Sequence, residues 1–393
     1  MDGTICCGTS PAWLELFLSQ SRADLEPNIT PYPFDHPVDT RGLVCLHEND
    51  YLRLSKDLRV LAAKASALDV GQLASSLYSG GRSGDLHGRL RNSIAMAMRC
   101  EDVNLTTNGW VANVGLIEAI TQPDMPVYLD QRAHASLWDG ARFSKGRAVM
   151  IRHNDPEFLE RRIQRCGPGV VCIDAWYSVE GTVSDIPAYV EVCERRDCLL
   201  VVDEAHSFGM TGTDAGGLAV AQGVAERVPF RTGSFSKAIG GHGGFVAGSA
   251  AAMWHLRHFG RPMIFSSAVL PCDVAAHLEA LHIAQQEPEL AANALGMAAS
   301  FRQALESRGI KHSGSQCQIV SISLPKPRLA SVAYARLRDL GVLASVFVPP
   351  GVSVGTSALR FTFHAAMDVT SVERAAYAVE QALGDLLPHR LAV

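Results

Sequence analysis

The sequence predicts an α/β protein with a mainly parallel sheet between helices, followed by a smaller C-terminal α+β domain. Two continuous apolar runs, residues 169–174 and 198–203, each end in an aspartate. Such runs are typical of strands buried on both faces of a parallel sheet. Residues 187–196 between them have helical spacing, so the three segments predict a strand–helix–strand unit.

The order of patterns along the chain predicts an arm and two domains. Residues 1–45 contain a short amphipathic segment at 13–19 and a proline-rich stretch at 27–37, and we expect them to form an N-terminal arm. Short apolar runs alternate with helical patterns over residues 46–285, which we expect to form the large domain. Residues 286–393 are expected to form the small domain.

The pattern within the small domain alternates between helices and strands. We expect helices at residues 288–308, 329–340 and 370–387, a strand at 318–324, and short strands around Val346 and Phe361.

Composition excludes several classes of protein. Hydrophobic residues make up 47% of the 393 residues, charged residues make up 19%, and the net charge is −5. This balance gives no electrostatic case for a nucleic-acid or membrane partner, and no apolar stretch approaches the length of a membrane span. The start of the sequence lacks a secretory signal, and its ten cysteines are scattered without metal-like spacing. We therefore expect reduced thiols, no bound metal and a cytoplasmic location.

The residues with the clearest chemistry are Asp203, His206 and Lys237. Asp203 ends an apolar run, His206 follows three residues later, and Lys237 lies in a loop of small residues 34 positions after Asp203. A lysine amine can form a Schiff base with the aldehyde of pyridoxal phosphate, and a carboxylate can keep the pyridine nitrogen protonated. The arrangement therefore predicts a pyridoxal phosphate site.

Other segments fit the same cofactor. Gly109 and Trp110 begin a predicted helix whose backbone amides suit a phosphate group. Ser234 and Ser236 flank the lysine and can donate to phosphate oxygens. His134 follows another apolar run, at the edge where ligands of open α/β sheets gather.

Each of these signals, taken alone, fits more than one chemistry. The Ser-x-x-Lys spacing of Ser234 and Lys237 also occurs in serine hydrolases, and the sequence Asp-Glu-Ala-His at 203–206 resembles that of nucleotide hydrolases. The nucleotide hydrolase interpretation fails because the chain has no upstream glycine-rich phosphate loop ending in Gly-Lys-Ser/Thr. Taken alone, His134 fits a structural role as well as a functional one, and Arg360 fits a surface ion pair.

The chain resembles the α-oxoamine synthases, fold-type I pyridoxal phosphate enzymes that join an amino acid to an acyl thioester. The resemblance covers nearly the whole chain, and its most specific segments are residues 134–137, 202–209 and 234–237. Within the family, residues 109–116 and 134–142 are closer to the quorum-sensing autoinducer synthases, which make α-aminoketones and related precursors.

The resemblance implies a role for each candidate residue. It implies that Lys237 is the Schiff-base lysine and proton shuttle, that Asp203 pairs with the pyridinium nitrogen, and that His206 reaches the ring oxygen. His134 is expected to stack on the ring. The remaining matches are Ser178 near the ring oxygen, Gly109, Trp110 and Ser234 at the phosphate, Ser266 and Ser267 contributed by a neighbouring subunit, and Asn49 and Arg360 at the substrate, with Arg360 holding its carboxylate.

The resemblance further implies a homodimer with shared active sites and a reaction that yields an α-aminoketone. The amino acid and acyl chain stay open, as does the choice between coenzyme A and an acyl carrier protein. Autoinducer synthases use medium-chain acyl donors with 2-aminobutyrate or S-adenosylmethionine. Alternatives are synthases of the 8-amino-7-oxononanoate, 2-amino-3-ketobutyrate or serine palmitoyltransferase type, a fold-type I aminotransferase, or a catalytically idle partner protein.

Two segments depart from the family. Val348 precedes two prolines where many members carry an arginine, which changes the contacts expected there for the carboxylate or thioester. Residues 79–87 differ from those of the autoinducer synthases and are nearer the general family, so we expect a different acyl group.

Overall fold

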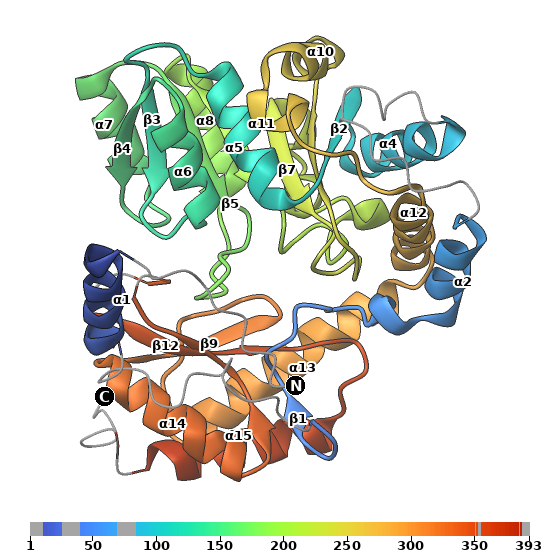
Figure 1. Cartoon of the computed structure of the whole chain (residues 1–393). Helices are drawn as coiled ribbons and strands as arrows, with labels where there is room; N and C mark the ends of the chain where they lie inside the picture. The colour runs from blue at the N-terminus through green and yellow to red at the C-terminus, as the bar shows by residue number, and fades with distance from the viewer. Residues whose placement is uncertain are drawn as a thin grey trace.

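A seven-stranded sheet organises the larger part of the computed structural model (Figure 1). The structure describes residues 11–25, 40–68, 84–349, 351–352, 355–384 and 386. The strand order is β2-β8-β7-β6-β5-β3-β4, and only β8 runs against the others. The strands are β2 (Asp102–Thr106), β3 (Pro126–Asp130), β4 (Arg147–Ile151), β5 (Val170–Asp174), β6 (Leu199–Asp203), β7 (Phe230–Ser234) and β8 (Gly244–Gly248). The predicted mainly parallel sheet is confirmed.

Helices cover both faces of this sheet. One face packs against α5 (Gly109–Ile120), α6 (Ala135–Phe143), α10 (Ala250–Phe259) and α11 (Arg261–Ile264). The other face packs against α2 (Leu58–Ser66), α4 (Gly84–Met98), α7 (Pro156–Cys166), α8 (Ile186–Arg195), α9 (Leu218–Ala221), α12 (Pro271–Gln286) and the short 3₁₀ helices η1 (Leu54–Lys56), η2 (Thr213–Ala215) and η3 (Ala225–Arg227). Burial on both faces explains why the central strands read as unbroken apolar runs.

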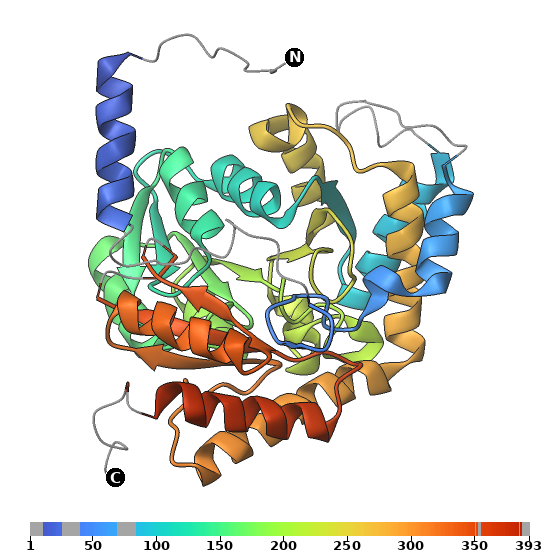
Figure 2. The ribbon, with the colours of Figure 1, turned by 60° about the horizontal axis from the view of Figure 1, so that its bottom comes forward.

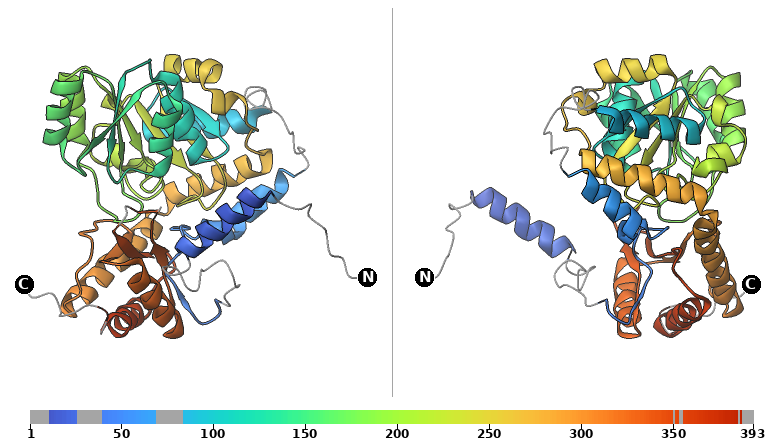
Figure 3. Two further views of the ribbon diagram at one scale, coloured as in Figure 1. Left: turned by 60° about the vertical axis from the view of Figure 1, so that its left-hand side comes forward. Right: turned by 90° about the vertical axis from the view of Figure 1, so that its right-hand side faces the viewer.

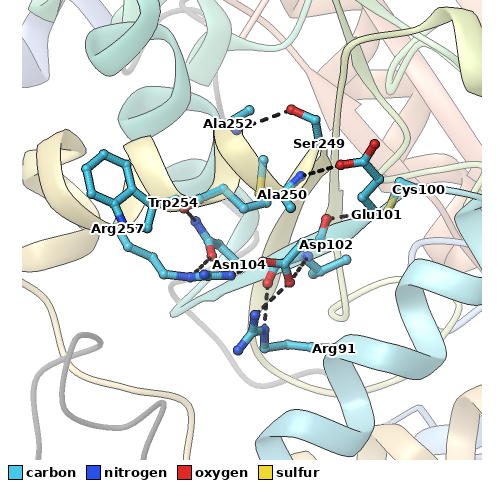
Figure 4. A network of polar contacts seen from close by, with 12 residues as sticks. Arg91, Cys100, Glu101, Asp102, Asn104, Ser249, Ala250, Ala252, Trp254 and Arg257 are labelled. Carbon is cyan, nitrogen blue, oxygen red and sulfur yellow. Dashed lines mark hydrogen bonds and ion pairs between the residues drawn. The ribbon is translucent and has the colours of Figure 1, made fainter.

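The edge strand β2 is held by a polar network (Figure 4). Asp102 accepts a hydrogen bond from Arg91 of α4 at 2.6 Å and a second bond from Arg257 of α10. Arg257 also donates to Asn104, whose side-chain amide donates to the Met253 carbonyl. One carboxylate therefore ties two helices on opposite faces of the sheet to its edge.

A second, smaller unit follows (Figure 1). Its antiparallel sheet has the order β11-β12-β9, made of β9 (Ile319–Leu324), β11 (Ser345–Phe347) and β12 (Ser357–Thr362). It packs on α13 (Pro288–Ser307), α14 (Pro327–Asp339) and α15 (Val369–Leu383) around a separate apolar core. The predicted helices and strands are present, with ends shifted by a few residues. The largest shift is at the end of the final helix, which ends at Leu383.

The N-terminal part divides between the two units. In α1 (Ala12–Leu25), the side chains of Trp13 and Phe17 are 69% and 59% exposed, and the helix projects from the rest of the chain (Figures 2 and 3). By contrast, β1 (Val44–Cys45) pairs with β10 (Val342–Leu343) and adds to the core of the smaller unit. We retain the boundaries near residues 45 and 285 as a proposal. None of the described helices is long and apolar enough to cross a membrane.

Residues 46–57, here called the connector, run from β1 to α2 and contact both units. At one end, Thr362 donates its backbone N–H to Leu46 and its hydroxyl to the Glu48 carbonyl. At the other end, the Asp50 carboxylate accepts from the backbone of Leu54 and from Ser55, and the Leu54 side chain packs in the core of the larger unit. The connector thus carries its own side chains into the boundary between the two sheets.

Candidate active site

The first turn of α5 and the end of β7 form one side of the site. Asn108 caps α5 by accepting from the Val111 N–H at 2.8 Å. The N–H groups of Gly109 and Trp110 belong to the first turn, where no intrahelical acceptor exists. A Cβ built on Gly109 would lie 3.1 Å from Cβ of Ser234, whose hydroxyl is 2.8 Å from that of Ser236. Two backbone N–H donors and two serine hydroxyls therefore lie together on this side of the site.

Asp203 is held at the carboxyl end of β6. It is 7% exposed, and its Oδ2 accepts from the Asn113 amide at 2.7 Å while its Oδ1 accepts from the Ala205 N–H at 2.8 Å. Asn113 lies on α5, and its oxygen accepts from Thr232 on β7. The position of the carboxylate is thus fixed by a helix and by the neighbouring strand.

His134 caps the start of α6 and joins the same network. Its Nδ1 lies 2.7 Å from the hydroxyl of Ser136, which accepts from Asn113. Its backbone N–H donates to Asp174 at 3.1 Å, and the edge of its ring meets Trp110 with centroids 5.9 Å apart. Burial lowers the pKa of His134, with Asp203 opposing and Lys237 adding to the effect, so the imidazole is neutral near neutral pH.

Lys237 lies in the tight loop between β7 and β8. The loop is closed by bonds from the Phe235 N–H to Gly243 and from the Gly241 N–H to Phe235. Burial, reinforced by the charge of Arg360 and opposed by Asp203, lowers the pKa of Lys237 to about 8. A sizeable fraction of this amine is therefore unprotonated near neutral pH, which is the form that acts as a nucleophile or base.

Arg360 approaches from β12 of the smaller unit and is 4% exposed. Its Nη2 donates to Asn49 Oδ1 at 2.9 Å and to the Tyr51 oxygen at 3.2 Å. The same phenol lies 2.7 Å from Nδ1 of His206. A polar chain thus runs from the smaller unit through the connector to His206, beside the other candidates.

No hydrogen bond among the described residues joins three of the predicted residues to this cluster. Ser178 is half-buried in the loop after β5, and Ser267 is exposed after α11. The hydroxyl of Ser266 is buried without a hydrogen-bond partner among the described residues. None of the hydrogen bonds of the described residues joins these serines to Lys237. Val348 is half-buried after β11, and residues 79–83 of the divergent segment lie outside the described residues.

The comparisons with known proteins agree with this geometry. A family model described as aminotransferase class I and II matches residues 41–379. The chain is 35% identical to an 8-amino-7-oxononanoate synthase of Anaeromyxobacter dehalogenans, with 89% of each chain covered. It is 30% identical to the CAI-1 autoinducer synthase of Vibrio campbellii, with 87% of each covered. The chain belongs to the α-oxoamine synthases.

The fold of this α-oxoamine synthase also matches solved structures. The serine palmitoyltransferase of Sphingomonas wittichii superposes with a TM-score of 0.87 over 97% of this chain and all of the other, at 24% identity. This likeness confirms the fold-type I architecture. Membership of the α-oxoamine synthases, shown by the relatives, makes the enzyme a pyridoxal phosphate-dependent acyltransferase.

The residues of this synthase fit that cofactor. The cradle of Gly109, Trp110 and Ser234 suits a phosphate, because a larger residue at position 109 would press on Ser234. Lys237 supplies an amine of lowered pKa, and Asp203 supplies a fixed carboxylate. When bound, the cofactor provides an electron sink that stabilises a carbanion beside the amino nitrogen of the substrate.

Sequence reasoning missed two residues that contact the candidate site, Asn113 and Tyr51. Asn113 is 2% exposed in an otherwise apolar part of α5, and a polar residue there signals a buried hydrogen-bond partner. Tyr51 gave no comparable signal, because its partner His206 is 155 positions away in the sequence.

Proposed function

We propose that this enzyme condenses an α-amino acid with an acyl thioester to give an α-aminoketone that serves as a quorum-sensing signal or secondary-metabolite precursor. In the reaction the amino acid loses its α-proton, a carbon–carbon bond forms to the thioester carbonyl, and the thiol leaves. The carboxyl group then leaves as carbon dioxide. Coenzyme A and an acyl carrier protein are both suitable thiols.

One observation carries this proposal: an amine of lowered pKa, Lys237, lies close to a fixed carboxylate, Asp203, and a buried guanidinium, Arg360. An amino acid needs a group to accept its α-proton and a group to hold its carboxylate. We assign the first task to Lys237 and the second to Arg360, with Asn49 as a further contact. A general base of this kind contributes roughly 10²–10⁴-fold.

The remaining assignments concern the cofactor. We assign Asp203 to the pyridine nitrogen, His206 and Ser178 to the ring oxygen, and His134 to the ring face. Gly109, Trp110 and Ser234 are assigned to the phosphate. We assign Ser266 and Ser267 to the site of a second copy of the chain in a homodimer, which agrees with the unpartnered hydroxyl of Ser266 and the exposure of Ser267.

The test is a panel of amino acids against acyl-coenzyme A thioesters of increasing chain length, with thiol release and carbon dioxide measured together. The amino acids are glycine, alanine, serine, 2-aminobutyrate and S-adenosylmethionine. Equal amounts of thiol and carbon dioxide, both lost in Lys237→Ala, are the expected result. Amino-group transfer to a keto acid without thiol release would instead identify an aminotransferase.

The same panel separates the proposed signal synthesis from a second candidate. The relative with 35% identity is an 8-amino-7-oxononanoate synthase, which favours that activity as the alternative. A preference for unsubstituted medium-length acyl chains supports the signal-type reaction. A strict requirement for an acyl chain with a terminal carboxylate supports the alternative.

A further inference from the structure

Tyr51 is a completely buried tyrosine at the boundary between the two sheets. Its side chain is 0% exposed, and the backbone around it is fixed because the Ala365 N–H donates to its carbonyl at 2.8 Å. Its hydroxyl contacts the connector, the smaller unit and the larger unit at once, through Asn49, Arg360 and His206. A buried hydroxyl with this many partners has its orientation dictated by them.

Counting donors and acceptors leaves two possible acceptors for the phenol proton. A tyrosine oxygen has one O–H to donate and two lone pairs that accept. Arg360 donates to it at 3.2 Å, and the Oδ1 atom of Asn49, which also contacts the phenol, can only accept. Arg360 therefore occupies one lone pair, and the phenol proton goes to either Asn49 or His206.

Two acceptors compete for that proton, and the distances decide between them. Nδ1 of His206 is 2.7 Å from the phenol oxygen, whereas Oδ1 of Asn49 is 3.2 Å away and already accepts from Arg360 at 2.9 Å. Hydrogen bonds donated by hydroxyl groups are usually about 2.7–2.8 Å long, whereas those donated by N–H groups are usually about 2.9–3.0 Å long, so the contact with His206 fits the phenol as the donor. Tyr51 thus donates to Nδ1, and His206 carries its single proton on Nε2.

The charge states agree with this assignment. Burial raises the pKa of Tyr51 to about 12 even though Arg360 and Gln318 act against it, so the phenol stays protonated. Burial lowers the pKa of His206 well below its usual range, and the charges of Lys237 and Arg360 add to that effect. The imidazole is therefore neutral, and one of its nitrogens must be an acceptor.

We propose that Tyr51 is a positioning residue that holds His206 in the tautomer with its N–H on Nε2, ready to donate to the ring oxygen of the cofactor. This inference rests on the proposed placement of His206 at that oxygen. It also explains why a buried tyrosine lies in the connector, because the same phenol oxygen accepts a hydrogen bond from Arg360. The group that binds the substrate carboxylate and the group that contacts the cofactor ring are therefore joined through one hydroxyl.

The first experiment measures the tautomer directly. Protein labelled with ¹⁵N-histidine is compared as wild type and Tyr51→Phe, before and after loading with pyridoxal phosphate, and His206→Gln assigns the signals. In the wild type we expect the Nδ1 of His206 to resonate as a bare acceptor and Nε2 as an N–H. In Tyr51→Phe we expect a mixture of tautomers. A proton on Nδ1 in the wild type, or identical signals in both proteins, would overturn the proposal.

The second experiment follows the visible absorption of the bound cofactor as a function of pH. A hydrogen-bond donor at the ring oxygen draws electron density away from that oxygen. The oxygen then attracts the proton on the nearby Lys237 nitrogen less strongly. Losing the orientation of that donor should raise the midpoint of the absorption change by roughly one pH unit in Tyr51→Phe, the scale of one hydrogen bond to a charged group. Reduced kcat with a smaller change in KM should accompany it.

Tyr128→Phe is the matched control. Tyr128 is also 0% exposed, and its hydroxyl donates at 2.6 Å to the carbonyl of Gly167. Gly167 precedes β5, whereas Lys237 follows the carboxyl end of β7. The variant loses a buried phenol bond and should leave the midpoint unchanged. An equal shift in both variants would overturn the proposal. If the tautomer changes in Tyr51→Phe but the midpoint does not, Tyr51 orients His206 as inferred, and the placement of His206 at the ring oxygen is wrong.

Discussion

The chemistry of Lys237 depends on its surroundings, because burial and the charge of Arg360 lower its pKa to about 8. Only the neutral amine attacks an aldehyde, so capture of pyridoxal phosphate by the cofactor-free protein should accelerate with pH. We expect about a tenfold increase per unit below pH 8 and a plateau above it. Stopped-flow absorbance measures the rate, and Lys237→Ala gives the background from other lysines. A rate that keeps rising to about pH 10 would contradict the lowered pKa.

Asp203 makes a second prediction at this scale. Asparagine keeps the shape of the side chain but lacks the negative charge that we assign to the pyridine nitrogen. Asp203→Asn should therefore retain the cofactor while kcat falls about 10²–10³-fold. Asp130→Asn is the control, since Asp130 is equally buried at the end of β3 but binds His153. Similar kcat values in the two variants would count against the assignment.

The residues that the sequence located are those with a local signal. Asp203 ends an apolar strand, His206 follows three residues later, and Lys237 lies in a loop of small residues, all of which are patterns visible in a single chain. The contact of Asn113 with Asp203 joins residues 90 positions apart, and periodicity carries no information on such a pairing. Periodicity also does not reveal which hydroxyl group contacts His206.

At the scale of elements, the lysine loop packs directly on the connector. Gly240 has a φ of +68°, and a Cβ there would lie 2.5 Å from the backbone nitrogen of Ser55. Gly240→Ala should therefore displace the loop that carries Lys237, lowering both kcat and thermal stability. The expected loss of stability is about 1–3 kcal/mol.

Gly296→Ala is the matched control for that change. Gly296 lies within α13, and a Cβ there would meet nothing within 4 Å. Alanine should stabilise the helix by about 0.5–1 kcal/mol and leave kcat unchanged. Urea unfolding and initial rates measure both variants, and a Gly240→Ala enzyme with normal stability and rate would contradict the close packing.

The Asp102 network makes a prediction about acid stability. Burial alone would raise the pKa of Asp102, but hydrogen bonds from Arg91 and Arg257 lower it overall from its ordinary value of 3.8. Its contribution to folding is therefore fully present above pH 3.8 and is lost as the pH falls through the lowered value. Asp102→Asn should cost about 1–3 kcal/mol at neutral pH, with a smaller difference in strong acid.

Urea titrations of both proteins across the acidic range measure this difference. A gap between wild type and Asp102→Asn that persists unchanged into strong acid would show that the ionised carboxylate is not what binds the two helices.

The elements themselves were largely predictable, for a physical reason. Strands β5 and β6 are buried on both faces, so their apolar runs are unbroken and end where the chain reaches the site. The reversed direction of β8 was not predictable, because glycine and alanine fill much of it and the pattern is the same in either direction. Nor was the pairing of β1 with β10, which depends on two short segments far apart in the sequence.

For the whole molecule, the proposed sharing of active sites in a homodimer predicts complementation between two inactive variants. Lys237→Ala removes the amine, and Ser267→Glu places a bulky carboxylate in the segment that we assign to the neighbouring site. Each homodimer should be inactive. Unfolding and refolding the two together should create mixed dimers with one intact site, restoring roughly a quarter of wild-type activity.

The outcome distinguishes two arrangements. If Ser267 instead serves the site of its own chain, every site of the mixed dimer carries one of the two defects, and no activity returns. Sedimentation of the mixture confirms that dimers formed, so an inactive mixture of dimers would refute the exchange of serines between sites.

The position of Trp110 has a practical consequence for studying this enzyme. Its indole is 42% exposed, lies against His134 and belongs to the turn that we assign to the cofactor phosphate. An indole in that place transfers its excitation to a cofactor that absorbs in the near ultraviolet and visible. The protein therefore carries its own fluorescent reporter of occupancy, and replacing Trp110 with phenylalanine isolates that signal from the emission of the other four tryptophans.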